Sequence, residues 1–85
     1  MIRPTKSARI DPVLVVDGER LRRKRLSTPS DDRHRRSMNQ KELAEAAFIS
    51  RSYLNEIEAG LKQPRLRVAL SIAKALGCDL DELIP

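Results

Sequence analysis

Apolar residues recur at helical spacing through the second half of the chain. The longest such stretch follows Pro64, has apolar side chains three and four positions apart, and stops at Gly77. Two shorter helices are expected before it, over residues 40–47 and 51–59. The positions that this spacing turns inward are Leu43, Ala44, Ala47, Leu54, Ile57, Leu66, Ala69, Ile72, Ala73 and Leu76.

Residues that favour helix ends stand where these patterns begin and stop. Asn39 followed by Glu42 is a capping-box candidate, in which each residue satisfies a backbone amide of the other. Ser50 can cap the next helix, and Gly60 can take the left-handed conformation that ends it. The two helices are thus expected to be separated by only three residues.

The pattern is less regular toward both ends of the chain. A first helix is expected over residues 17–27, capped by Asp17 and anchored by Leu21 and Leu26. The apolar run 13–16 is compatible with a brief strand or with a strap lying on the helical core. A second capping-box candidate, Asp79 with Glu82, predicts a short fifth helix. The expected fold class is all-α, with five helices.

Charge divides the chain into an arm, a domain and an inserted loop. Residues 1–16 are expected to form a flexible basic arm, and residues 17–85 a single domain with a basic loop at 28–37. Residues 1–38 contain eleven Lys or Arg and five Asp or Glu, whereas residues 39–85 contain six and seven. This asymmetry is compatible with a polyanionic partner or with a solvated basic tail.

Composition argues against several classes of protein. With 85 residues, one cysteine and one histidine, the chain offers no disulfide and no metal-ligand cluster. It also lacks a phosphate-binding glycine loop and a Ser/His/Asp set, so we expect neither an enzyme nor a cofactor. No apolar run is long enough to cross a membrane and no signal peptide is visible, which favours the cytoplasm.

The connection between residues 47 and 51 points to a specific motif. Two short helices joined by three residues must cross steeply, and only a small side chain fits where they meet. Ala44 stands at that position on the inner face. Residues 40–59 are therefore predicted to form a helix-turn-helix.

Four stretches of the chain resemble the lambdoid-repressor-like, or xenobiotic-response-element (Cro/C1-type), family of helix-turn-helix regulators. They are residues 18–25, 39–44, 50–60 and 73–83. The resemblance implies a five-helix DNA-binding domain whose recognition helix, here 51–59, enters the major groove.

Base contacts follow from that implied geometry. Arg51 is the strongest candidate, because a guanidinium can bond both acceptors of a guanine. For Glu56 the alternative is an ion pair with a neighbouring Lys or Arg. The residues expected to meet base edges are Ser50, Arg51, Ser52, Asn55 and Glu56.

Phosphate contacts and one structural pair are also implied. Gln40 opens the helix that grips the DNA backbone in the family, and Tyr53 offers a hydroxyl unless it packs on the domain. Arg25 and Glu58 match an ion pair that lies beneath the recognition helix. The full set of expected phosphate contacts is Gln40, Tyr53, Lys62, Gln63, Arg65, Arg33, Arg35 and Arg36.

Three positions depart from the family pattern. Phe48 replaces the usual glycine of the turn, so the turn either follows another path or holds a strained, outward Phe. The loop at 28–37 makes the link between the first two helices about eight residues longer than usual, and Arg65 replaces a Ser or Thr cap. The loop ends in a basic cluster that either contacts DNA or is solvated.

The predicted function is sequence-specific binding of double-stranded DNA by a bacterial or phage-encoded regulator, most simply a repressor. A homodimer is expected, at least on DNA, and no small-molecule effector is evident. The alternatives are an antitoxin-like protein-interaction module with the same fold and an architectural DNA-binding factor.

Overall fold

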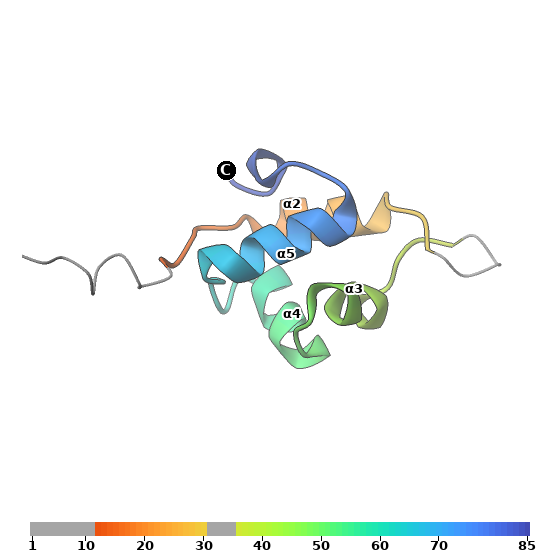
Figure 1. Cartoon of the computed structure of the whole chain (residues 1–85), viewed down its shortest axis with the longest axis horizontal. Helices are drawn as coiled ribbons and strands as arrows, with labels where there is room; N and C mark the ends of the chain where they lie inside the picture. Colours follow the sequence, from red (N-terminus) through yellow and green to blue (C-terminus); the bar gives the residue numbers. More distant parts are fainter. Residues whose placement is uncertain (1–11, 31–35) are drawn as a thin grey trace, which may run out of the picture.

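The computed structural model describes residues 12–30 and 36–85, and its regular structure there is helical (Figure 1). This confirms the all-α class, although the expected fifth helix is a single turn of 3-10 helix. The described ranges contain two isolated β-bridges but no extended β-strand. The elements are α2 (Gly18–Leu26), α3 (Gln40–Ala47), α4 (Arg51–Glu58), α5 (Leu66–Leu76) and η1 (Leu80–Glu82).

The predicted caps are in place at the helix ends. Asp17 accepts hydrogen bonds from two amides at the start of α2, and Ser50 accepts one from the Tyr53 amide. Asn39 and Glu42 form the complete capping box of α3. These bonds satisfy amides that have no partner within their own helix.

The core lies between α3 and α5, with α4 packed against both α3 and α2 (Figure 1). Leu26, expected to be an anchor of the first helix, is instead 42% exposed. The inner face of α2 carries Leu21 and, one turn later, Arg25, so Leu26 points away from it. The buried apolar residues are Val16, Leu21, Leu43, Ala44, Ala47, Leu54, Ile57, Ala69, Ile72, Ala73, Leu76 and Leu83.

The segment before α2 is a strap on the helical core. The Leu14 amide donates to the Pro64 carbonyl at 2.9 Å, and the Asp17 amide donates to the Leu83 carbonyl at 2.8 Å. Val16 is buried, whereas Val13 and Val15 are exposed. Residues 12–16 therefore pack on the domain and do not belong to a free arm, and residues 1–11 lie outside the described part.

The loop expected at 28–37 is closed at its base. The Met38 amide donates to the Thr28 carbonyl at 2.8 Å, and the Ser30 amide donates to the Arg36 carbonyl at 2.7 Å. The Ser30 hydroxyl also bonds the Glu42 carboxylate, which ties the loop to the first turn of α3. Arg33 and Arg35 lie outside the described residues.

The turn between α3 and α4 keeps the left-handed conformation that usually requires glycine. Phe48 has φ 61° and ψ 40°, and the residue is 91% exposed. For a residue with a side chain this conformation costs roughly 1–2 kcal/mol. Of the two alternatives posed by the sequence, the structure has the strained, outward Phe.

No described helix is both long and apolar enough to cross a bilayer.

Candidate nucleic-acid interface

Helices α3 and α4 form the helix-turn-helix expected over residues 40–59. Residues 48–50 join them, and the Ile49 amide donates to the Ala44 carbonyl at 2.9 Å, which closes the turn. Ala44 is only 2% exposed, because α4 and α5 pack against α3 on its inner face. The small side chain thus allows the close helix crossing that the sequence predicts.

The first turns of α4 present a polar, open surface. Four of the five residues expected to contact bases lie together around a hollow of about 450 Å³, with Gln40 of α3 at its side. The fifth, Ser50, is exposed, and its hydroxyl oxygen caps the helix. The residues lining the hollow are Gln40, Arg51, Ser52, Asn55 and Glu56.

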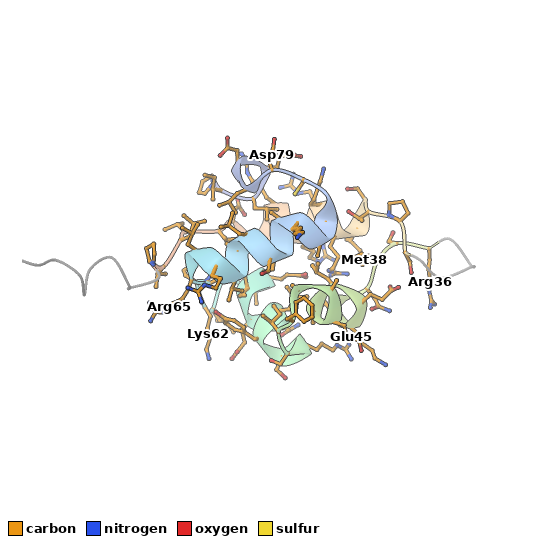
Figure 2. All side chains as sticks on the ribbon, viewed as in Figure 1. Arg36, Met38, Glu45, Lys62, Arg65 and Asp79 are labelled. Atoms are coloured by element: carbon orange, nitrogen blue, oxygen red, sulfur yellow. The ribbon has the colours of Figure 1, made fainter. Side chains whose placement is uncertain are left out.

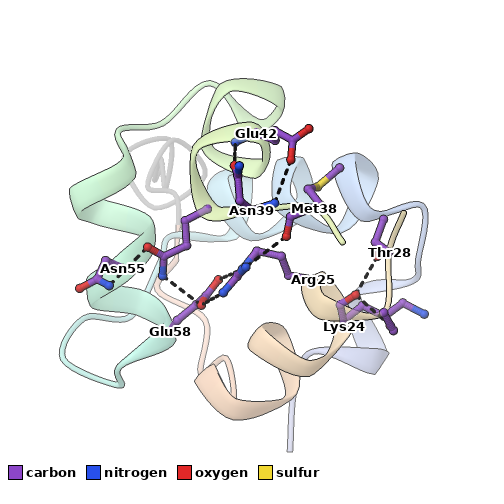
Figure 3. Close-up of polar contacts among 10 residues, drawn as sticks. Lys24, Arg25, Thr28, Met38, Asn39, Glu42, Asn55 and Glu58 are labelled. Carbon is purple, nitrogen blue, oxygen red and sulfur yellow. Dashed lines mark hydrogen bonds and ion pairs between the residues drawn. The ribbon is translucent and has the colours of Figure 1, made fainter. Parts of the chain in front are cut away.

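A buried ion pair lies directly behind this surface. Arg25 of α2 donates from Nε to Glu58 Oε2 at 2.7 Å and from a terminal nitrogen to Oε1 at 2.9 Å. The two side chains are 9% and 3% exposed. Arg25 also donates to the Met38 carbonyl just before α3, at 3.1 Å. The pair expected from the family resemblance therefore links α2 to α4 and to the segment that leads into α3 (Figure 3).

Hydrogen bonds continue from this pair to the exposed face of α4. Gln40 Nε2 donates to Glu58 Oε1 at 3.1 Å, and Asn55 Nδ2 donates to Gln40 Oε1 at 3.4 Å. The dashed lines in Figure 3 follow this path from Arg25 to Asn55. The amide of Gln40 is thus oriented by a buried charge, and it orients in turn a side chain expected to meet a base.

Two other expected DNA contacts pair with each other. Lys62 Nζ lies 3.5 Å from Glu56 Oε1, and both side chains are well exposed. The alternative posed for Glu56 is therefore present in the structure. An exposed pair of this kind is weak and exchanges readily, so it leaves either side chain able to meet DNA.

The remaining phosphate candidates divide by their surroundings. Gln63 Oε1 accepts a hydrogen bond from the Val16 amide at 2.8 Å, which gives its side chain a role in holding the strap. Tyr53 is half-buried against the core. Arg36 and Arg65 are exposed, and in Figure 2 they lie on opposite sides of the helical domain.

Arg22 lies beside these residues but is not among the DNA contacts expected from the sequence. It is exposed and shares a second hollow with Gln40, Asn55 and Glu58. Within the described residues it has no ion pair, whereas Arg20, Arg23 and Lys24 of the same helix each pair with a carboxylate. Arg22 lies three residues before Arg25 and therefore on a similar face of α2. The sequence alone does not show that this face turns toward α4.

A separate polar cluster joins α2 to η1. Lys24 Nζ lies 3.0 Å from Glu82 Oε1, and this contact lowers the pKa of Glu82 and raises the pKa of Lys24. Burial raises the pKa of the nearby Cys78 thiol, as expected for a thiol packed beside the core. In residues 12–30 and 36–85 no group of three or more potential ligands could hold a metal ion.

Comparison with known proteins gives two matches. A family model described as helix-turn-helix matches residues 32–83. The chain is also similar to a solved structure, the restriction-modification controller protein C.AhdI from Aeromonas hydrophila. The identity is 30% and the TM-score 0.67, over 79% of this chain and 89% of that chain. A comparison with curated proteins gives no significant match.

Proposed function

The chain belongs to the Cro/C1-type helix-turn-helix family of DNA-binding transcription regulators, and on that premise we propose that it is a repressor that places α4 in the major groove. The observation that carries the proposal is the open hollow at the start of α4. Its lining joins one guanidinium, two amides, one hydroxyl and one carboxylate, which are groups suited to base edges.

Arg51 is the proposed centre of sequence recognition. It is exposed in the first turn of α4, and no ion pair within the described residues occupies it. A cation there opposes the helix dipole, so its placement is explained better by an external acceptor than by stability. Asn55 is held by Gln40 and keeps its carbonyl and one amide hydrogen for a neighbouring base.

Phosphate contacts would lie around this centre. The start of α3 offers backbone amides beside Gln40, and Arg22 lies next to it across the second hollow. Arg36 and Arg65 lie on opposite sides of the helical domain, as the two strands bordering a groove require (Figure 2). The other proposed contacts are Tyr53, Lys62, Gln63, Arg33 and Arg35.

The proposal includes a homodimer on a pseudo-palindromic site, with half-sites near one helical turn apart, in a bacterial cytoplasm. It also includes a second candidate setting. Because the similarity spans most of a restriction-modification controller protein, the present chain is a candidate regulator of restriction-modification genes. A recognised site upstream of such genes would support this setting, and its absence there would remove it.

Selection of sites from a random DNA pool, followed by titration in salt, tests the proposal. A defined motif is expected. Arg51→Ala should cost about 1–3 kcal/mol of discrimination and relax one position of the motif. Strong binding without a motif would indicate an architectural factor, and no binding would indicate an antitoxin-like module; either result overturns the proposal.

Arg22→Gln tests the backbone contact separately. Affinity should fall about equally for all sequences, and the salt slope should decrease by about 1. Arg20→Gln is the matched control, because Arg20 lies on the same helix but pairs with Asp17. Equal slopes for the two variants would remove Arg22 from the interface.

A further inference from the structure

The turn residue Phe48 combines two unfavourable features. It holds a left-handed backbone at φ 61°, and this apolar residue is 91% exposed. At the other two left-handed positions of the described ranges the residue is glycine, Gly60 and Gly77, which avoids the strain. Neither feature of Phe48 stabilises the monomer, and strained backbone tends to persist at sites that contact another molecule.

A hollow of about 360 Å³ lies directly beside the ring, between the end of α3 and the second half of α5. Small side chains form most of its wall, so it has room for one aromatic ring. It shares no residue with the hollow on the DNA-facing side of α4, so the two can be occupied together. The lining residues are Ala46, Phe48, Ser71, Lys74 and Ala75.

The charges around this patch are also complementary to one another. Glu45 precedes the turn and Lys74 borders the hollow, and both side chains are exposed. Glu45 is labelled on α3 in Figure 2. Within the described residues neither side chain forms an ion pair. One patch thus carries a projecting ring, a hollow for a ring, an anion and a cation.

We infer that this patch binds a second copy of the same chain. A two-fold axis brings the same surface of both copies together, so a projection must meet a recess that lies beside it on the same face. Phe48 of each copy then enters the hollow of the other. Glu45 of each copy meets Lys74 of its partner.

The expected contact is weak by itself. Two aromatic rings bury roughly 300–500 Å², well below the roughly 1,200 Å² of a stable interface. We therefore expect rapid, concentration-dependent association without DNA in the high micromolar range. On DNA the same contact would join copies already held close together, because linkage raises their effective concentration.

Sedimentation velocity of the full chain without DNA, from about 5 to 500 µM, tests the inference. Phe48→Gly should weaken association at least tenfold and keep or raise the Tm, since glycine accepts the backbone conformation without strain. Leu61→Ser is the matched control: this exposed Leu lies outside the patch and its replacement should leave association unchanged. A second test uses Glu45→Lys and Lys74→Glu, each of which should weaken association, while the double exchange restores it.

Equal sedimentation of the parent chain and Phe48→Gly at every concentration would overturn the inference. Equal losses in Phe48→Gly and Leu61→Ser would also overturn it, because association would then be non-specific. The inference does not depend on DNA binding. A chain that associates but selects no DNA motif fails the proposed function alone, and one that selects a motif but does not associate through Phe48 fails this inference alone.

Discussion

Two adjacent residues of α2 form ion pairs of opposite character. Arg25 points into the domain and meets Glu58 through two bonds of 2.7 and 2.9 Å, with side chains 9% and 3% exposed. Lys24 points outward and meets Glu82 at 3.0 Å, with side chains 33% and 48% exposed. Both pairs connect α2 to a segment far along the chain, yet only the first lies behind the candidate DNA surface.

The comparison shows that an ion pair can serve geometry more than stability. Burying two charges costs desolvation that their attraction need not exceed, so the Arg25–Glu58 pair is poorly explained as a source of stability. It does fix the amide of Gln40 and, through it, Asn55. The Lys24–Glu82 pair fixes no side chain of the interface and remains open to water and salt.

The largest expected effect comes from breaking only one side of the buried pair. Glu58→Ala leaves the Arg25 guanidinium buried without its carboxylate, and the free energy of unfolding should fall by roughly 3–5 kcal/mol. Urea denaturation followed by circular dichroism measures this loss. Glu82→Ala is the control, since it removes the carboxylate that pairs with Lys24, a residue of the same helix α2, at an exposed site. Similar midpoints for the two variants would contradict the distinction between the pairs.

A smaller effect on stability is expected when both buried charges are removed. Arg25→Met combined with Glu58→Leu leaves no unpaired charge, so the free energy of unfolding should return to near that of the parent chain. Gln40 would still lose its acceptor, and because one orienting hydrogen bond is lost we expect about tenfold weaker binding to the selected DNA site. Fluorescence anisotropy on the same preparation measures this affinity. Unchanged affinity with restored stability would show that the pair does not orient the interface.

Features that depend on neighbouring residues are predictable from the sequence, whereas those that depend on tertiary packing are not. The helix caps at Asp17, Asn39 and Ser50 are correctly predicted, because each depends on residues within one turn. The prediction that Leu26 anchors the first helix is wrong, because its burial depends on which face of α2 turns inward. The buried Arg25 determines that face. The Arg25–Glu58 pair was expected only through the family resemblance, since nothing in local spacing links residues 33 positions apart.

The candidate site is predicted less completely than the fold. Its centre at the start of α4 is marked by helix position, but the role of Gln63 in holding the strap is a tertiary contact without local signal. The same is true of Arg22, whose lack of an ion pair within the described residues becomes visible only when its neighbours in α2 are seen paired. Individual DNA contacts remain predictions.

The smallest expected effect concerns the exposed pair and its dependence on pH. The pKa of Glu82 is lowered in the folded chain, so its contribution to stability is present above its ordinary value of 4.5 and is lost as pH falls through the lowered value. The pKa of Lys24 is raised, so its contribution is lost only as pH rises above its ordinary value of 10.5. Lys24→Met should therefore lower the Tm slightly at pH 7 and have no effect in strong acid.

Thermal denaturation of both chains at about pH 7 and at about pH 2, far below the ordinary Glu value, measures this difference. Arg23→Met is the control, because Arg23 pairs with Glu19 within α2 and does not reach η1. A Tm difference for Lys24→Met that persists unchanged at the lower pH would contradict an electrostatic origin.

The connection between α2 and α3, residues 28–37, is closed at its base, so the chain can change in length there. Thr28 and Met38 are joined by a backbone hydrogen bond, and Ser30 is tied to Glu42, so the spacing of α2 and α3 is set before the intervening residues begin. Closing a longer loop costs only about 0.6 kcal/mol per doubling of its length. Insertions there can be acquired or trimmed during evolution, and a peptide tag or fluorescent label can be grafted there, without rebuilding the domain.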